Sequence, residues 1–100
     1  YKPNIQDIRE SPSIILIEEL LSMGANLQYH DPFVPQLKLT KQVLKSKPLN
    51  KALIESKDII LITTGHTDVD YDLLVKASTP VLDTRNALKK YASKKHIHLL

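Results

Sequence analysis

The feature that most constrains the fold is the uninterrupted apolar run of residues 59–62, Ile-Ile-Leu-Ile, which follows the charged residues Lys57 and Asp58. A strand covered on both faces has this composition, and parallel sheets produce such strands. Helical and strand patterns alternate along the chain, which indicates a parallel sheet with helices on its faces. We therefore expect an α/β fold, a three-layer Rossmann-like parallel sheet with helices on both faces. One hundred residues suffice for one core, so residues 1–100 should form a single domain.

Four segments have helical patterns. In the first, Ser11 suits the N-cap, Pro12 the first helical position and Gly24 the left-handed position after the last turn. Apolar residues lie on more than one side of this segment, so we expect a helix that is mostly buried against a sheet. The other predicted helices are residues 49–55 with Asn50 as cap, residues 70–77 and residues 86–93.

Strand patterns fill the intervals. Residues 26–30 alternate and stop at Asp31-Pro32, and residues 58–63, 81–83 and 96–100 read as further strands. Residues 33–49 are interpreted as an irregular excursion. Tyr1-Lys2 runs directly into a loop, although a strand should feed the first helix of a strand–helix–strand unit. We therefore expect the sequence to begin at or just past the C-terminal end of a strand.

Composition excludes several classes of function. There is no Cys, so this chain offers no disulfide, thiolate metal site or Cys nucleophile. No apolar run approaches the roughly 18 residues of a membrane helix, and no signal peptide is recognisable, so we expect a cytoplasmic protein without membrane contact. The net charge is +3, but with one Phe and no Trp a base-stacking surface is not expected. We interpret the C-terminal lysines as a solvated face, with no nucleic-acid partner.

Cations occur at positions where α/β proteins bind ligands. Ligands of open α/β sheets gather outside the carboxyl ends of the strands. Lys2 precedes the first helix and Arg85 follows the strand at residues 81–83. Together they could supply an ammonium and a guanidinium to an anionic ligand such as a diphosphate. Taken singly, each is as well explained as a solvated surface charge.

His30, Asp31 and His66 raise the question of a metal site. No His, Asp or Glu set has the short helical spacing of a zinc site, so no metal is expected. We expect His66 to pack or hydrogen-bond at its turn, and Asp31 to accept hydrogen bonds from local backbone N–H groups. Glycine occurs only at positions 24 and 65, so no Gly-rich turn is available for a dinucleotide pyrophosphate. The domain should not hold NAD by itself.

Five stretches, taken in order and spacing, resemble the C-terminal, UDP-binding domain of the UDP-glucose/GDP-mannose dehydrogenase family. The resemblance extends from Tyr1 to about Tyr91. The stretches are YKPNIQDIRESP at residues 1–12, YHDP at residues 29–32, DIILIT at residues 58–63, His66, and VLDTRN at residues 81–86.

The resemblance implies roles for four residues. Tyr1, Lys2 and Arg85 would contact the UDP-sugar, and Arg9 would reach toward NAD bound mainly by a separate N-terminal domain. The family's catalytic Cys lies in another part of the enzyme, so no catalytic residue is expected here. This domain alone should be inactive. The full enzyme, with its N-terminal and central domains, would be a homo-oligomer that oxidises the sugar C6 hydroxyl to a carboxylate through a thioester.

Residues 9–12 and 29–32 look most like the UDP-N-acetylhexosamine 6-dehydrogenases, whose products feed surface polysaccharides, and residues 64–66 and 83–86 agree with that resemblance. The identity of the sugar itself is set by residues elsewhere in such enzymes. The alternative is a free-standing α/β binding or interaction module, for example of the receiver type, because fold alone does not fix function. A receiver requires paired acids after its first strand, and neither Asp31 nor Asp83 has such neighbours.

Overall fold

The computed structural model describes residues 12–100. The predictions for Tyr1, Lys2, Arg9 and Ser11 therefore lie outside the described residues. Within the described part, the elements in chain order are α1 (Pro12–Ser22), β1 (Gln36–Lys38), β2 (Val43–Lys45), α2 (Lys51–Glu55), β3 (Ile60–Ile62), α3 (Tyr71–Lys76), β4 (Val81–Asp83), the 3₁₀ turn η1 (Lys89–Tyr91) and β5 (Ile97–Leu99).

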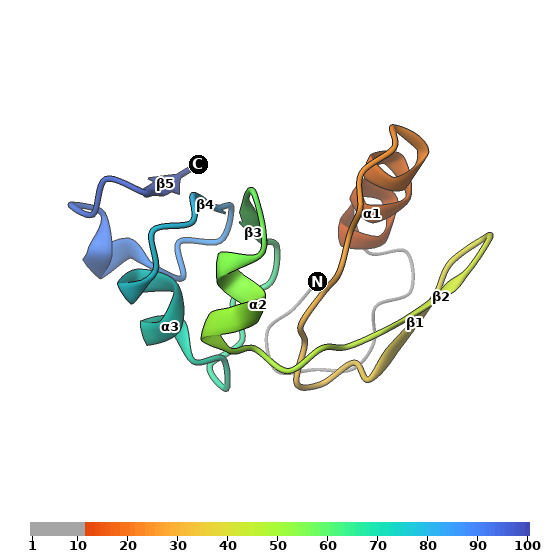
Figure 1. Cartoon of the computed structure of the whole chain (residues 1–100), viewed down its shortest axis with the longest axis horizontal. Coiled ribbons are helices and arrows are strands. Elements are labelled where there is room, and N and C mark those ends of the chain that lie inside the picture. Colours follow the sequence, from red (N-terminus) through yellow and green to blue (C-terminus); the bar gives the residue numbers. More distant parts are fainter. Residues whose placement is uncertain (1–11) are drawn as a thin grey trace.

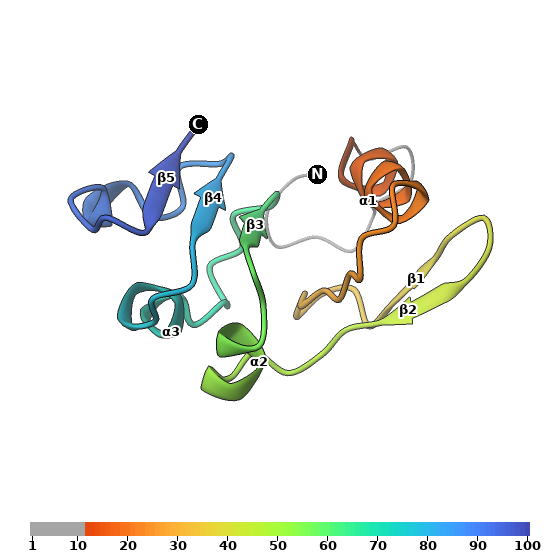
Figure 2. The same cartoon turned by 45° about the horizontal axis from the view of Figure 1, so that its top comes forward.

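The central element is a parallel sheet in the order β3-β4-β5. Its three strands point the same way, and α2 and α3 lie along one side of it (Figures 1 and 2). Helix α3 connects β3 to β4, and the segment containing η1 connects β4 to β5. The predicted α/β class with a parallel, Rossmann-like sheet is confirmed, as are the strands expected at residues 58–63, 81–83 and 96–100.

One face of this sheet carries the core. Ile62, Val81 and Ile97 point from the three strands toward Ile54 of α2 and Leu74 of α3, and all five are buried. Ile54 is 0% exposed, and complete burial of such a side chain contributes about 1.5–3 kcal/mol. The helices predicted at residues 49–55 and 70–77 are therefore present, and they supply the core as their apolar positions indicated.

The other face of β3 is less covered than the apolar run predicted. Leu61 stands opposite Leu82, which stands opposite His98, so these three share the face away from the core. Leu61 is 36% exposed and Ile59, just before the strand, is 53% exposed. The expectation that both faces of this strand are covered is wrong within residues 12–100. The cause is the position of α1, which stands apart from β3 in both views (Figures 1 and 2).

Helix α1 has the predicted bounds but not the predicted burial. It ends at Ser22, and Gly24 follows with φ of 91°, a conformation that glycine adopts without a Cβ clash. None of its residues is buried, and Ile15 is 60% exposed. The expectation of a mostly buried helix is therefore wrong. Within residues 12–100, no strand of the sheet packs against its apolar residues.

Three local predictions are also corrected. Residues 26–30 form no strand, because among residues 12–100 no strand pairs with them; the Tyr29 carbonyl accepts a single backbone bond there, from the Lys47 N–H at 2.8 Å. Residues 33–49 are not wholly irregular, since β1 and β2 pair antiparallel with Leu37 opposite Leu44. Residues 86–93 form only the turn η1 rather than a longer helix.

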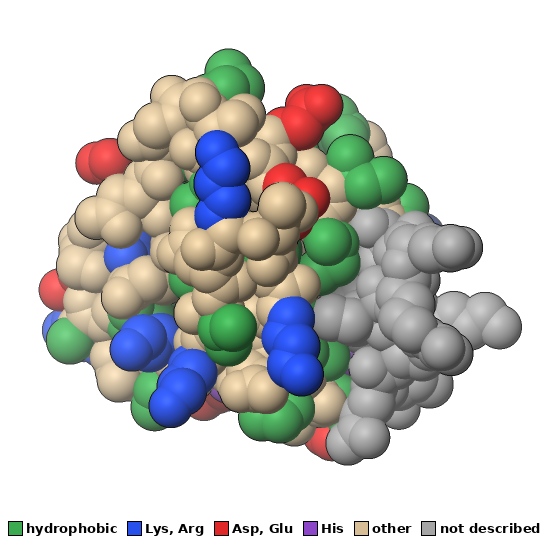
Figure 3. Space-filling view, turned by 90° about the vertical axis from the view of Figure 1, so that its right-hand side faces the viewer, with side chains coloured by type: hydrophobic (Ala, Val, Ile, Leu, Met, Phe, Trp, Pro, Cys, Tyr) green, Lys and Arg blue, Asp and Glu red, His purple; other side chains and the backbone are tan. Residues whose placement is uncertain are grey.

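The β1–β2 hairpin is joined to α1 by one side chain. The Glu18 carboxylate accepts hydrogen bonds from the Thr40 N–H and hydroxyl, both at 2.9 Å. These bonds, the backbone one first, lower the pKa of Glu18 from its ordinary value. Figure 3 shows the side of the molecule on the right of Figure 1, where Lys or Arg side chains and hydrophobic side chains are both at the surface. Val43 of the hairpin, 53% exposed, is one exposed apolar residue.

Replacing Asn50 with Ala should destabilise the domain modestly. The Asn50 Oδ1 accepts the Leu53 N–H at 2.8 Å and caps α2. Loss of such a cap costs about 0.5–2 kcal/mol. Chemical denaturation should show this decrease, and Asn50→Asp, which keeps the acceptor, should restore most of it. Equal losses for the two variants would mean that the cap does not account for the effect.

Candidate functional site

The candidate site lies at the carboxyl ends of β3 and β4, where the two following turns meet. A Cβ placed on Gly65, in the turn after β3, would lie 3.8 Å from the Cβ atoms of Arg85 and Ala87 in the turn after β4. Thr84 fastens the second turn to β3, since its N–H and its hydroxyl both donate to the Ile62 carbonyl, at 3.1 and 2.7 Å. The two turns thus form one structured edge.

Asp83 determines the shape of the turn that carries Arg85. Its side chain is 0% exposed, with Oδ1 accepting the Arg85 N–H at 2.9 Å and Oδ2 accepting the Leu88 N–H at 2.7 Å. Asn86, between these donors, has φ of 57°, which Asn tolerates better than most residues. The buried carboxylate is a positioning residue that holds the backbone of residues 85–88. The Arg85 side chain remains exposed to solvent.

The groups presented at this edge suit an anionic, oxygen-rich ligand. Within residues 12–100, the Arg85 guanidinium has no acidic partner. The Thr64 hydroxyl is buried and, among the described residues, has no hydrogen-bond partner. A guanidinium recognises phosphate through paired charge-assisted hydrogen bonds. Of the residues singled out from the sequence, the structure places Arg85 here, whereas Tyr1, Lys2 and Arg9 lie outside the described part.

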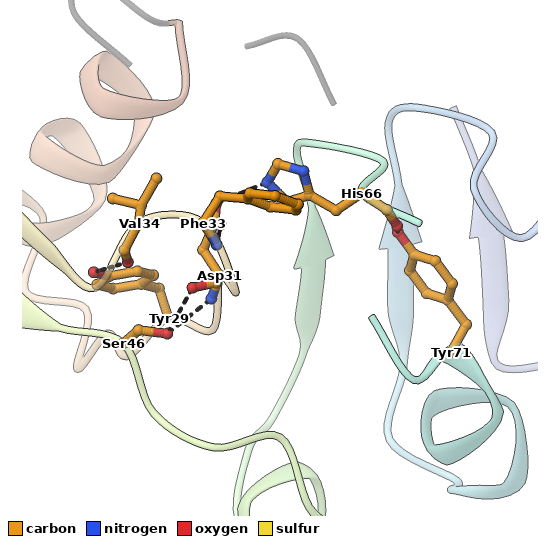
Figure 4. Close-up of polar contacts among 7 residues, drawn as sticks. All are labelled: Tyr29, Asp31, Phe33, Val34, Ser46, His66 and Tyr71. Carbon is orange, nitrogen blue, oxygen red and sulfur yellow. Dashed lines mark hydrogen bonds and ion pairs between the residues drawn. The ribbon is translucent and has the colours of Figure 1, made fainter. Parts of the chain in front are cut away.

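Asp31 and His66 form a second polar feature, drawn in Figure 4. His66 is 2% exposed, and its Nε2 lies 3.0 Å from Asp31 Oδ2. The Phe33 ring lies against the imidazole, with ring centroids 4.8 Å apart. Asp31 Oδ1 accepts the Phe33 N–H at 2.8 Å, so the expected local backbone bond is confirmed. His66 does pack and hydrogen-bond, as predicted, but its partner comes from a turn 35 residues away.

Further contacts stabilise both sides of this pair. The Tyr71 hydroxyl donates to the His66 carbonyl at 2.6 Å, and burial, followed by the Asp83 charge, raises the pKa of Tyr71. On the other side, the Asp31 N–H donates to Ser46 Oγ at 2.9 Å. The Asp31–His66 pair is therefore a structural clasp between the loop after residues 26–30 and the turn after β3.

Sequence reasoning missed this clasp, although a signal for it was present. Asp31 and His66 each follow an extended segment, and the carboxyl ends of parallel segments meet at one edge of a sheet. No group of three His, Cys, Asp or Glu residues in the described part could hold a metal ion. None of the helices within residues 12–100 is long and apolar enough to cross a membrane.

Comparison with known proteins identifies the group to which this sequence is similar. The family model described as "UDP-glucose/GDP-mannose dehydrogenase family, UDP binding domain" matches residues 1–90. A UDP-glucose 6-dehydrogenase of Rhizobium meliloti is 30% identical over 96% of this chain and 23% of its own length. The UDP-N-acetyl-D-mannosamine dehydrogenase of Methanococcus maripaludis is 30% identical over 95% of this chain and 23% of its own length.

A third relative is also a nucleotide-sugar dehydrogenase, matched over a shorter part of the chain. The UDP-glucose 6-dehydrogenase YwqF of Bacillus subtilis is 30% identical over 69% of this chain and 16% of its own length. The chain thus spans less than a quarter of the length of these three relatives. No solved structure matches it significantly.

Proposed function

Because the chain belongs to the UDP-glucose/GDP-mannose dehydrogenase family and comprises its UDP-binding domain, we propose that the edge carrying Arg85 binds the nucleotide of a UDP-sugar. The observation that supports this most directly is the turn at residues 83–88. There Asp83 fixes the backbone from inside the core and leaves the Arg85 guanidinium exposed without a protein carboxylate within residues 12–100. A cation held in this way is preorganised for a phosphate.

The proposal assigns the ligand contacts among four residues. Arg85 contacts the UDP-sugar together with Tyr1 and Lys2, while Arg9 reaches toward NAD. Residues 1–100 act as one domain of a longer polypeptide whose N-terminal and central domains supply the remaining parts. Support comes from the family match and from relatives several times longer than this chain.

The whole protein would then be an NAD-dependent UDP-sugar 6-dehydrogenase in the cytoplasm, a homo-oligomer that makes an acidic sugar for surface polysaccharides. NAD does not fit the described residues. Gly24 ends a helix and Gly65 packs on the next turn, so neither provides the Gly-rich approach that a pyrophosphate requires. This domain therefore holds the nucleotide of the substrate, and redox chemistry belongs to the rest of the enzyme. The chain alone would not oxidise a UDP-sugar.

Arg85→Ala in the full-length enzyme should lower kcat/KM for the UDP-sugar by roughly tenfold to a hundredfold. The reason is that one charge-assisted hydrogen bond is worth about 1.5–3 kcal/mol. Lys2→Ala should have a similar effect, whereas Arg9→Ala should chiefly raise the KM for NAD. Steady-state kinetics with each substrate varied in turn measures all three.

Lys95→Ala is the matched control, because Lys95 is an exposed cation just before β5, at the amino ends of the parallel strands and so at the opposite end of the sheet from the turn. It should leave both KM values unchanged, and the thermal stability of the Arg85 variant should stay close to that of the wild type. An Arg85→Ala enzyme with the same kcat/KM as the Lys95→Ala enzyme would remove Arg85 from the proposed site.

A further inference from the structure

Thr64, in the turn after β3, has a buried hydroxyl group that the rest of the described structure does not use. Its Oγ1 has no hydrogen-bond partner within residues 12–100. Buried polar groups are nearly always hydrogen-bonded, because a buried donor without an acceptor lowers stability. An exception at the edge of the sheet that carries the candidate site indicates that the hydroxyl is used in another state of the protein.

Other buried threonine hydroxyls in this fold are paired. Thr79 Oγ1 donates to the Ile54 carbonyl at 2.9 Å, and Thr84 Oγ1 donates to the Ile62 carbonyl at 2.7 Å. The Ile62 carbonyl, the last of β3, also accepts the Thr84 N–H at 3.1 Å, so both of its lone pairs are occupied. The backbone acceptor at the end of this strand is therefore already used, and Thr64 is left without one among the described residues.

The turn that carries Thr64 lies against the turn that carries Arg85. A Cβ on Gly65, the next residue after Thr64, would lie 3.8 Å from the Cβ of Arg85. The end of the turn is fixed, because the His66 carbonyl accepts the Tyr71 hydroxyl at 2.6 Å (Figure 4). The Thr64 hydroxyl and the Arg85 guanidinium thus belong to two adjoining turns whose backbones are held in place before a ligand binds.

We propose that the Thr64 hydroxyl donates a hydrogen bond to a phosphate oxygen of the nucleotide that Arg85 holds. This contact rests on the proposed nucleotide site and makes that site selective for a phosphorylated ligand. Phosphate oxygens accept hydrogen bonds, which is what the Thr64 hydroxyl lacks, and they are the groups that a guanidinium binds best. Thr64 as a whole is half-buried, so a rotation about its Cα–Cβ bond is enough to turn the hydroxyl toward such a ligand.

Thr64→Val in the full-length enzyme tests the contact, because valine keeps the shape of the side chain and removes the hydroxyl. The inhibition constant of UDP, measured against the UDP-sugar, should rise about tenfold to a hundredfold, the range for one hydrogen bond to a charged group. The inhibition constant of uridine, which has no phosphate, should not change. Thr64→Ser, which keeps the hydroxyl, should restore most of the affinity for UDP.

Thr79→Val is the matched control, since it removes a buried, paired hydroxyl just before β4, at the opposite end of the sheet from Arg85. It should leave both inhibition constants unchanged and lower the midpoint of thermal unfolding of this domain, because a hydrogen bond is lost. Thr64→Val should leave that midpoint unchanged or raise it, because its hydroxyl has no acceptor within residues 12–100. A fall as large as that of Thr79→Val would mean that the Thr64 hydroxyl is already paired without ligand, and would overturn the proposal.

Arg85→Ala, measured in the same way, distinguishes failure of this contact from failure of the proposed function. If Arg85→Ala raises the inhibition constant of UDP and Thr64→Val does not, the nucleotide site stands without Thr64. Equal weakening of UDP and uridine by Thr64→Val would also overturn the phosphate contact. If neither substitution changes inhibition by UDP, the proposed function itself is wrong.

Discussion

Asp83→Asn should destabilise the domain by about 2–4 kcal/mol. The carboxylate is 0% exposed and accepts two backbone N–H groups, those of Arg85 and Leu88. An amide of the same shape keeps one acceptor and turns an N–H₂ group toward the second donor. Hydrogen bonds to charged groups are worth about 1.5–3 kcal/mol, and a buried donor left without an acceptor adds its desolvation cost.

Urea denaturation monitored by circular dichroism measures this loss, which corresponds to a fall of roughly 10–30 °C in Tm for a domain of this size. Asp68→Asn, at an exposed position, is the control and should stay within about 0.5 kcal/mol of wild type. Equal stability for the two variants would mean that the turn at residues 83–88 is held by its backbone alone. In the full-length enzyme, Asp83→Asn should also weaken UDP-sugar binding, because Arg85 loses its fixed backbone.

His66→Ala should cost about 2–4 kcal/mol, because it removes a buried ring and leaves the Asp31 carboxylate without its partner. A double-mutant cycle with Asp31→Ala separates these contributions. The two residues contact one another, so the double variant should be more stable than the sum of the single losses indicates, by about 1 kcal/mol or more. Denaturation of the four proteins under one set of conditions provides the measurement.

His98→Ala is the matched control, since His98 is exposed on β5. It should change the free energy of unfolding by less than about 0.5 kcal/mol. Strict additivity of the Asp31 and His66 losses would contradict the clasp, whatever the size of each. Such a result would mean that packing, including that against Phe33, accounts for the burial of His66 without the Asp31 contact.

The parts of the fold that could be predicted are those decided by local chemistry. Pro12 and Gly24 mark the two ends of α1, and Asn50 marks the start of α2, because caps and left-handed turns depend on one or two residues. The runs at residues 59–62 and 81–83 predicted the parallel sheet, because continuous apolar strands are typical of parallel sheets.

The parts that could not be predicted depend on neighbours distant in sequence. Residues 26–30 have a good strand pattern but form no strand, because pairing requires a partner at hydrogen-bonding distance. The same reason explains why α1 keeps its apolar face exposed. The hairpin was not predicted, since residues 33–49 contain Pro35 and Pro48, which disfavour strands, and the pairing of Leu37 with Leu44 has no signal in a segment this short.

For the candidate site, the sequence identified Arg85 and indicated that ligand-binding residues lie at the carboxyl ends of the strands. The resemblance to the dehydrogenase family is confirmed by the family model, which matches residues 1–90. It did not reveal why Arg85 is presented outward. That depends on the burial of Asp83, which appeared in the sequence as an acidic residue like any other. Nor could spacing show that Asp31 and His66 meet, because the contact closes a loop of 35 residues. The roles of Tyr1, Lys2 and Arg9 stay predictions.

The hairpin formed by β1 and β2 offers a place where the length of the chain can change at little thermodynamic cost. Its strands pair mainly with each other, and its tip is closed by the Leu39 N–H bonding to the Gln42 carbonyl at 2.8 Å. Loop length enters the free energy of folding only logarithmically, about 0.6 kcal/mol for each doubling. A reporter sequence inserted between Lys41 and Gln42 would thus lie away from the turn that carries Arg85. A label attached there would not contact a ligand bound at that turn.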